Sequence, residues 1–562
     1  MFQRAKFTTL TITITVFVLI GWFFSYSMAG GNEEKYYKID KGLHYLREVF
    51  ETIARNYVDE VDPEVLSKAA IEGMLENFDP YTVFFKDPGS QQMRMITRGK
   101  YGGVGMEISV QSQQVVVISP MEGSPAQRAG IRAGDIVTKI DGVLTNSLNL
   151  QDASEHLRGK VGTPVMLEVM RPGLDKPLEI TLIREEITLE DVTYAGFVEP
   201  GTAYFRLSAF SDKASEELKS AIHELQADMP IQRVILDLRS NPGGLLTAAV
   251  DIANIFLPPG QLVVSTRGIH ESEHKFYTNE SPLLPDQPLV VLINESSASA
   301  SEIVAGAIQD WDRGVLVGSE TFGKGLVQKV YPIDRINQAY LKITTAKYYV
   351  PSGRCIQKED YKKDTDFFVD HSDSTEYDQK VDYFTQNRRV VHGGGGIYPD
   401  VVVDRENITR FLQTLLAKGY FFQFTVDYLS DHSEYSDPRN VPVTDKVLED
   451  FRKYAMERNF SFDMEGEEQL SKFLKIAADE KFQDRDIKDL VGVALEKLRK
   501  EKERQFNKFK PQIRELLIAE FAEKSGGLAS RIVANMPFDN QLQGALQVLK
   551  NGQEYREILA IR

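Results

Sequence analysis

A short apolar run, a turn of small residues and an amphipathic helix follow one another near the middle of this 562-residue chain. Residues 288–293 (Pro-Leu-Val-Val-Leu-Ile) are typical of a buried strand. Ser299–Trp311 then has the apolar spacing of a helix that buries one face. Strand-like and helix-like segments alternate in the same way from Ile187 to Asp404, so we predict an α/β core over residues 187–404.

Ser299 lies at the turn between this strand and this helix, and it has two interpretations. Ser299-Ala-Ser-Glu302 matches a capping box, in which the serine only caps the helix. A helix N-terminus also offers free N–H groups and a positive dipole end to a developing oxyanion. The small neighbours Ala298 and Ala300 would let a peptide carbonyl approach, which favours a nucleophile.

Lys324 is the candidate base for that serine. To accept a proton, a lysine must lose roughly three units of pKa from about 10.4, which costs about 4 kcal/mol. Burial among apolar groups is the usual cause, and Phe322, Leu326 and Val327 flank Lys324. The alternative is an ordinary surface lysine in a loop. Together, the serine and the lysine suggest a hydrolase that uses no histidine.

Two other motifs in this region are weaker. Gly318–Lys324 has the glycine spacing of a phosphate-binding loop, but Gly325 replaces the required Ser or Thr and a strand-like run follows where a helix is needed. His270-Glu-Ser-Glu-His274 has the spacing of a zinc-protease motif. It is polar all round and lies between two strand-like runs, so we predict a hairpin there and no metal site.

Three motifs in this order resemble the C-terminal processing peptidases, also called tail-specific proteases. The serine motif is Ser297-Ala-Ser-Ala-Ser-Glu302, the lysine motif is Phe322-Gly-Lys-Gly-Leu-Val-Gln328, and the third motif is Leu236-Asp-Leu-Arg-Ser-Asn-Pro-Gly-Gly-Leu245. The resemblance implies that Ser299 is the nucleophile, Lys324 the general base and Gln328 a residue that supports the lysine.

The third motif is also informative without the resemblance. A strand at Arg233–Leu238 leads into an Asn-Pro-Gly-Gly turn, and glycines can present backbone N–H groups to a substrate oxygen. The resemblance implies an oxyanion hole formed by Gly243, Gly244 and the N–H of Ala300. An ordinary tight turn is the alternative. Because strand positions four apart are about 13 Å apart, Gln328 can meet Lys324 only if the chain bends.

Residues 99–186 resemble a PDZ domain. They begin with Tyr101-Gly-Gly-Val-Gly-Met-Glu-Ile108 and continue through Gly123-Ser-Pro-Ala126 and Ala129–Gly142. The loop formed by Gly102, Gly103, Val104 and Gly105 can hold a terminal carboxylate with its N–H groups, and the following strand can pair with an extended peptide. The resemblance implies that this domain binds protein C-termini ending in apolar residues.

The ends of the chain complete the predicted architecture. Residues 1–30 contain a basic start and then an uncharged apolar stretch, which indicates a signal peptide or a signal anchor. Residues 31–98 have a helical pattern in which Pro63 begins a second helix, and residues 405–562 form a charged helical extension. We expect this extension to pack on the core or to mediate dimerisation, in preference to carrying a second activity.

Composition excludes some functions. The net charge of −16 argues against a general nucleic-acid binder. Cys355 is the single cysteine, so no internal disulfide forms and no second cysteine offers a thiol nucleophile.

We therefore predict a multidomain α/β protein with an α/β protease core, an inserted PDZ-like domain, an N-terminal helical region and a helical C-terminal extension. Its predicted function is that of a serine endopeptidase without metal or cofactor, on the periplasmic side of a bacterial cell envelope. The membrane contact is through residues 1–30. The alternative is a non-catalytic peptide-binding scaffold. The sequence leaves open the oligomeric state and any activating adaptor.

Overall fold

The computed structural model describes residues 34–561, except for gaps at 87–94, 96, 112, 335, 337–338, 359–381, 405–407, 433–434, 436, 465 and 481–484. The described chain divides into two units at Phe84. In the first unit, residues 34–56 are helical, and helix α2 (Pro63–Leu75) begins after the Asp62 cap, which confirms the predicted start at Pro63. The predicted signal segment lies outside the described residues.

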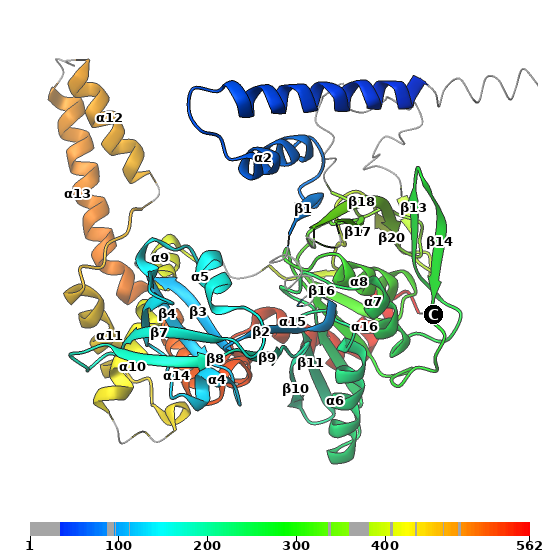
Figure 1. The fold of residues 1–562 in the computed structure, drawn as a ribbon. Coiled ribbons are helices and arrows are strands. Elements are labelled where there is room, and N and C mark those ends of the chain that lie inside the picture. Colours follow the sequence, from blue (N-terminus) through cyan, green and yellow to red (C-terminus); the bar gives the residue numbers. More distant parts are fainter. Residues whose placement is uncertain are drawn as a thin grey trace, which may run out of the picture. The chain divides into compact units, whose positions relative to one another are not determined.

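The second unit begins with a β-rich domain (Figure 1). Its main sheet has the order β3-β4-β5-β7-β8, with β6 paired to β5, so β3 lies at an edge. Strand β2 pairs with β9 as a separate antiparallel ladder. The elements of this domain are β2 (Lys100–Gly103), β3 (Met106–Gln111), β4 (Gln114–Pro120), α4 (Pro125–Arg128), β5 (Ile136–Ile140), β6 (Val143–Leu144), α5 (Leu150–Leu157), β7 (Pro164–Met170), β8 (Leu178–Ile183) and β9 (Glu185–Thr188).

A six-stranded sheet forms the centre of the second unit, with the order β10-β11-β12-β15-β16-β21. Its neighbouring strands are parallel except for the β10–β11 pair. The strands are β10 (Val192–Glu199), β11 (Thr202–Leu207), β12 (Arg233–Asp237), β15 (Leu289–Ile293), β16 (Val315–Gly318) and β21 (Val401–Val402). Parallel strands of this kind are normally covered on both faces, which explains their nearly continuous apolar sequences.

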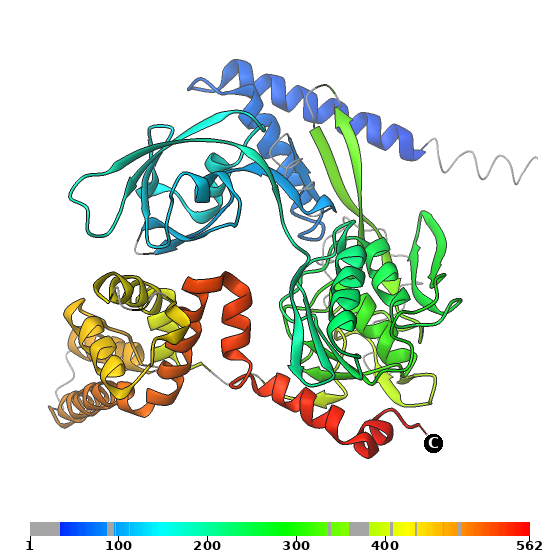
Figure 2. The ribbon, with the colours of Figure 1, turned by 90° about the horizontal axis from the view of Figure 1, so that it is seen from below.

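Helices cover the two faces of this sheet. Alternate strand side chains, such as Leu236 and Val291, pack against α6 (Ala214–Asp228), α7 (Leu246–Asn254) and α8 (Ala300–Asp310). The opposite side chains, such as Ile235 and Leu292, pack against α15 (Asn540–Lys550) and α16 (Gly552–Ile558). Figure 2 shows these last helices in red beside the green core. The final part of the predicted extension therefore completes the α/β core.

β17, which follows Lys324 in the sequence, belongs to a second sheet. In this sheet β17 pairs with β18, β18 with β13, and β13 with β14. Its strands are β13 (Leu262–Gly268), β14 (Glu271–Tyr277), β17 (Leu326–Asp334) and β18 (Ala339–Tyr349). β13 and β14 form an antiparallel hairpin in which His274 faces Thr266. The hairpin prediction for His270–His274 is confirmed, and this segment lacks the helix that a zinc-protease motif needs. A short hairpin pairs β19 (Asp382–Phe384) with β20 (Val390–His392).

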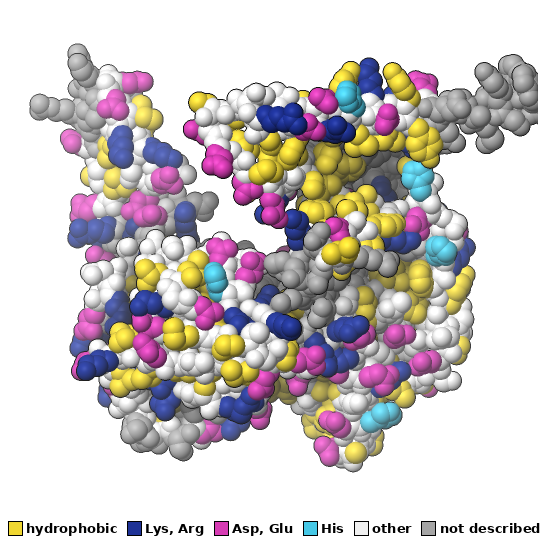
Figure 3. All heavy atoms as spheres, viewed as in Figure 1, with side chains coloured by type: hydrophobic (Ala, Val, Ile, Leu, Met, Phe, Trp, Pro, Cys, Tyr) yellow, Lys and Arg dark blue, Asp and Glu magenta, His cyan; other side chains and the backbone are white. Residues whose placement is uncertain are grey.

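The other C-terminal helices have a core of their own, which is rich in phenylalanine. They are α9 (Arg410–Ala417), α10 (Tyr420–Asp431), α11 (Asp445–Glu457), α12 (Glu467–Asp479), α13 (Arg485–Lys508) and α14 (Lys510–Asn535). Gln423 of α10 donates to Gln111 of β3 at 3.2 Å, so this helical group contacts the β-rich domain. Among the helices of the described segments, none combines the length and hydropathy needed to cross a bilayer. Acidic and basic side chains are interspersed on the face shown in Figure 3.

Candidate active site

Ser299 stands between β15 and α8, as the strand–turn–helix prediction requires. Its backbone angles are φ 56° and ψ −114°. An ordinary helix cap has extended backbone angles, whereas a non-glycine residue at positive φ is strained and persists only where the surrounding structure holds it. Glu302 accepts the Ser299 N–H as the predicted capping box requires, but the positive φ of the serine is not that of an ordinary cap. Its conformation is of the kind found where a side chain is presented for chemistry.

The carboxylate of Glu302 holds the serine and lysine segments together. Its Oε2 accepts the N–H of Ser299 at 2.8 Å and the N–H of Lys324 at 2.9 Å. Its Oε1 accepts the N–H of Gly323 at 2.7 Å and the hydroxyl of Thr321 at 2.6 Å. Burial raises the pKa of Glu302, and these four hydrogen bonds act in the opposite direction. A single buried oxygen thus connects the backbones of the two predicted catalytic residues.

Tyr348 makes a second connection between the same two residues. Its hydroxyl lies 3.1 Å from the carbonyl oxygen of Ser299 and also within hydrogen-bond distance of the carbonyl oxygen of Lys324, so its single proton is shared between these two acceptors. The Tyr348 side chain is almost wholly buried, so these carbonyls are satisfied without water. Glu302 binds the two N–H groups and Tyr348 binds the two carbonyl groups. The relative position of the two residues is therefore fixed at the backbone.

Lys324 lies just before β17, in a segment without regular secondary structure. The residue is half-buried, and its neighbours Gly323, Gly325 and Leu326 are buried. Of the three apolar residues expected to bury it, Leu326 is buried and Val327 half-buried, but Phe322 is exposed, so the predicted burial of Lys324 is only partial. A side chain at Gly325 would lie 2.8 Å from the backbone nitrogen of Gln357, so the glycine allows two chain segments to approach closely.

The predicted oxyanion turn lies against the serine. A Cβ on Gly243, whose φ is 95°, would come within 2.8 Å of the Ala300 nitrogen and within 2.7 Å of the Ala298 carbonyl oxygen. The carbonyl of Asn241 accepts the Ala298 N–H at 3.0 Å, which joins the turn to the serine segment. The N–H of Gly243 donates to Asn241 Oδ1 at 2.9 Å. Gly244 lies against the end of β11, where a Cβ would meet the Phe210 carbonyl.

The side chain of Gln328 contacts a neighbouring strand. It lies on β17, and its Nε2 donates to Thr344 Oγ1 of β18 at 3.2 Å. An irregularity in the β17–β18 register falls between Val327 and Gln328. The structure thus brings Ser299, Lys324, Gly243 and Ala300 together, while it links Gln328 to a neighbouring strand.

The predicted carboxylate loop differs from expectation in its first half. Gly102 and Gly103 are not in a loop, because they belong to β2 and pair with Glu186 and Glu185 of β9. Val104 and Gly105 lie between β2 and β3, and Gly105 has a φ of 69°. A side chain at Gly102 would lie 2.2 Å from the carbonyl oxygen of Gly159, so this glycine serves strand packing.

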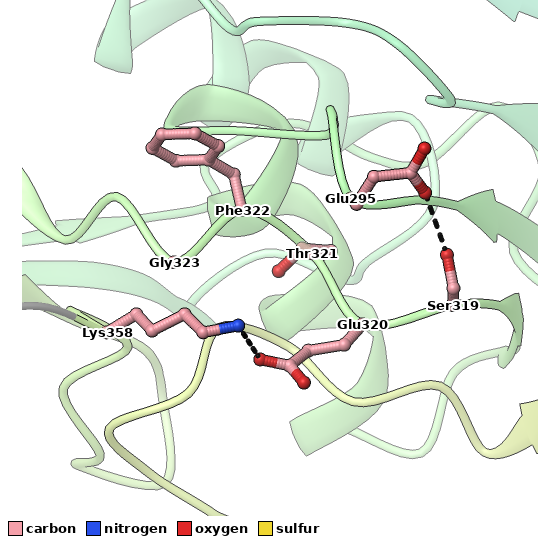
Figure 4. A pocket seen from close by; sticks show the side chains of 7 residues that line it. All are labelled: Glu295, Ser319, Glu320, Thr321, Phe322, Gly323 and Lys358. Atoms are coloured by element: carbon pink, nitrogen blue, oxygen red, sulfur yellow. Dashed lines mark hydrogen bonds and ion pairs between the residues drawn. The ribbon is translucent and has the colours of Figure 1, made fainter. Parts of the chain in front are cut away.

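A pocket of about 450 Å³ lies beside the lysine segment (Figure 4). It is lined by Glu295, Ser319, Glu320, Thr321, Phe322, Gly323 and Lys358. Lys358 pairs with Glu320 at 2.8 Å, and the Ser319 hydroxyl donates to Glu295 at 3.2 Å. Five consecutive lining residues, Ser319–Gly323, lead directly to Lys324, so the pocket adjoins the lysine segment.

Sequence reasoning missed the two residues that fix the dyad. The capping-box spacing pointed to Glu302 as a partner of Ser299, but it gave no sign of the contact with Lys324, 22 positions away. Tyr348 begins the segment Tyr348-Tyr-Val-Pro-Ser-Gly-Arg354, which resembles a later block of the family, but that resemblance gave no sign of its contacts with Ser299 and Lys324. Within the described residues, no group of three or more His, Cys, Asp or Glu side chains has the geometry of a metal site.

Comparisons with known proteins match every part of this architecture. The model of peptidase family S41 matches residues 201–367, and a PDZ domain model matches residues 116–171. The N-terminal domain of the activating protease CtpB matches residues 25–88, and a C-terminal helical domain of PDZ-proteases matches residues 411–549.

Curated relatives and solved structures extend this similarity. A carboxy-terminal-processing protease of Bartonella bacilliformis is 39% identical over 335 residues, covering 59% of this chain and 75% of the relative. A carboxyl-terminal-processing protease of Synechocystis sp. is 40% identical over 297 residues, covering 51% and 68%. The solved photosystem II D1 C-terminal processing protease is 28% identical, covers 63% of this chain and 91% of its own, and has a TM-score of 0.35.

The fold, the site and these matches define a serine-type peptidase with a PDZ domain. More particularly, the chain belongs to the carboxy-terminal-processing protease family. The predicted fold class, family and enzyme class are confirmed.

Proposed function

We propose that Ser299 is the nucleophile and Lys324 the general base of this peptidase. The observation that carries the assignment is the shared oxygen of Glu302, which accepts the N–H groups of both residues at 2.8 and 2.9 Å. The positive φ of Ser299 adds to it, because strain of this kind gathers at functional sites.

The reaction follows from the chemistry of the two side chains. Neutral Lys324 takes the hydroxyl proton as Ser299 Oγ attacks the substrate carbonyl, and the resulting ammonium gives that proton to the leaving amine. Lys324 then takes a proton from water as the water oxygen attacks the acyl-enzyme, and it returns this proton to Ser299 Oγ as the acyl bond breaks. The N–H of Ala300, at the first position of α8, would stabilise the oxyanion, together with the turn at Gly244. The N–H of Gly243 would take part only after leaving Asn241 Oδ1, to which it donates at 2.9 Å. Gln328, which the resemblance assigns to support of the lysine, lies on the strand that follows Lys324.

The PDZ domain is proposed to recognise the C-terminus of the protein substrate. β3 lies at the edge of its sheet, and an extended peptide can add to an exposed edge through main-chain hydrogen bonds. Val104 and Gly105 lie between β2 and β3, and their N–H groups are proposed to bind the terminal carboxylate. Substrates ending in apolar residues remain the predicted class.

Export is a further part of this proposal. The apolar segment within residues 1–30 supports a periplasmic location, either with a retained membrane anchor or after signal cleavage. The similarity of residues 25–88 to a domain of an activating protease supports regulation by a partner protein or by a second copy.

The test is cleavage of an unstructured protein with an apolar C-terminus by the full chain in mild detergent. Wild type is compared with Ser299→Ala, Lys324→Met and the control Lys329→Met. Lys329 is an exposed lysine five positions further on, paired with Glu271. We expect cleavage by wild type and Lys329→Met only, with or without chelator.

Each other outcome has a definite meaning. Full cleavage by Lys324→Met would disprove the role of this lysine. Loss of cleavage in chelator would restore the metalloprotease hypothesis. Tail binding by all four proteins without cleavage, also after adding a candidate activator, would favour the scaffold.

A further inference from the structure

Arg239 lies within the third motif, but the proposed reaction gives it no role. It follows β12 and stands two residues before Asn241, which begins the proposed oxyanion turn. Its guanidinium has five N–H donors, and the structure shows five hydrogen bonds from it. Two go to Asp237 at 2.9 and 2.7 Å, two to Asp539 at 2.9 and 2.7 Å, and one to Gln541 at 3.1 Å.

This arrangement is largely shielded from solvent. The Asp237 side chain is fully buried, and the side chains of Arg239 and Asp539 are 14% and 22% exposed. Bidentate pairs between arginine and carboxylate fix orientation as well as distance. Burial would lower the pKa of Arg239, but the two carboxylates raise it well above its usual value, so the guanidinium stays charged.

Asp539 belongs to the C-terminal extension, 300 residues after its partner. It caps α15, since its Oδ1 accepts the N–H of Leu542 at 3.0 Å. The apolar face of α15, which includes Leu546 and Leu549, packs on the central sheet. Asp539 is therefore anchored to the sheet from which the oxyanion turn emerges.

The turn itself depends on how Arg239 is held. Ser240, the next residue, has a φ of 58° and donates its N–H to Asn294 Oδ1 at 2.8 Å. The Asn241 carbonyl then accepts the hydroxyl of Ser301 at 2.9 Å. Gly243 approaches the Ser299 backbone so closely that a Cβ would not fit. A small rotation at Arg239 would thus change the direction of the N–H groups beside the nucleophile.

We propose that Asp539 is a positioning residue for the oxyanion turn, so that the C-terminal extension completes the catalytic machinery. The role acts through Arg239 and rests on the proposed function of Ser299 and the turn. An oxyanion hole binds the transition state more strongly than the substrate, so disturbing it lowers kcat and leaves KM nearly unchanged.

The test is the Asp539→Asn variant of the full chain. Asparagine caps helices as well as aspartate does, so α15 is preserved while the bidentate charged pair is lost. We expect kcat to fall at least about tenfold and KM to change by less than about twofold. Amide hydrogen exchange of residues 240–245 should become faster.

The matched control is Lys550→Gln. It removes another ion pair between α15 and the core, that of Lys550 with Glu199 at 2.5 Å, at the far end of the helix. This variant should keep the wild-type kcat and the wild-type exchange of residues 240–245. Equal kcat values in Asp539→Asn and wild type would overturn the proposal, as would a loss that the control shares.

The exchange measurement separates this proposal from the one on which it rests. It needs no substrate, so it can be read even if the wild-type chain does not cleave. Faster exchange with an inactive wild type would refute the catalytic assignment and support the positioning contact. Unchanged exchange of residues 240–245 would refute the positioning contact itself.

Discussion

Replacing Glu302 with glutamine tests how the dyad is held. The amide has one acceptor oxygen, and it is best placed toward the N–H groups of Ser299 and Lys324. Its NH₂ group can then face Thr321, whose hydroxyl can accept, but the N–H of Gly323 loses its acceptor. An unsatisfied buried N–H costs about 1–3 kcal/mol. The hydrogen bonds from the N–H groups of Ser299 and Lys324 then have a neutral acceptor in place of a charged one, and each weakens by about 1 kcal/mol.

These contributions sum to about 3–5 kcal/mol. The neutral amide avoids the burial cost that raises the pKa of Glu302, so the lower value, about 3 kcal/mol, is expected. Because a chain of several domains does not unfold in one step, the assay is amide hydrogen exchange of residues 321–326. A change of about 3 kcal/mol in local opening corresponds to roughly 100-fold faster exchange.

Glu295→Gln is the matched control for this variant. It makes the same chemical change at a nearby carboxylate that forms an exposed hydrogen bond to Ser319. Exchange in residues 321–326 should stay within about threefold of wild type in this control. The same small change in Glu302→Gln would refute the reasoning, since the carboxylate would then not be what holds the lysine segment.

Three further predictions concern buried groups of the second unit. Tyr348→Phe removes the hydroxyl between the two dyad carbonyls and should lower kcat by about tenfold, the rate equivalent of about 1.4 kcal/mol; an unchanged kcat in a peptide-cleavage assay would contradict this. Arg354→Met leaves the fully buried Asp310 without its ion pair at 3.0 Å, and amide hydrogen exchange of α8 should become at least about 100-fold faster, the equivalent of a loss of about 3–5 kcal/mol; unchanged exchange would mean that the pair contributes little. Burial by itself would raise the pKa of the Asp237 carboxyl, but the charge of Arg239 outweighs burial and holds that pKa below 3.8. The ionised carboxylate therefore stabilises the fold above pH 3.8, and this stabilisation is lost as the pH falls through the lower pKa of the folded protein. In Asp237→Asn the melting temperature should therefore fall less steeply than in wild type as the pH is lowered below about 4. The same pH dependence in both proteins would rule this out.

The catalytic segments were predictable because their signals are local. The apolar run before Ser299, the small residues of its turn and the helical spacing after it are all contiguous, and β15 and α8 follow them closely. The hairpin at His270 was equally local, since two strand-like runs flanked a polar tip. Family resemblance then joined the serine, lysine and glycine motifs, which single patterns could not do.

Errors and omissions arose where pairing between distant segments decides the outcome. Gly102 and Gly103 look like an open loop in sequence, but β9 supplies the partner strand more than 80 residues later. Whether a glycine pair forms a loop or a strand depends on such a partner, which local composition does not specify.

By itself, the sequence determined the α/β core, the strand–turn–helix at Ser299 and the identity of the candidate dyad, because hydrophobic periodicity and turn chemistry act over a few residues. Only the tertiary structure decided that Glu302 and Tyr348 bind both members of the dyad and that Asp539 holds Arg239. Those contacts depend on the order of strands in the sheets and on the packing of α15 over one face. Both are set by burial of apolar surface across the whole unit, which no short window of sequence contains.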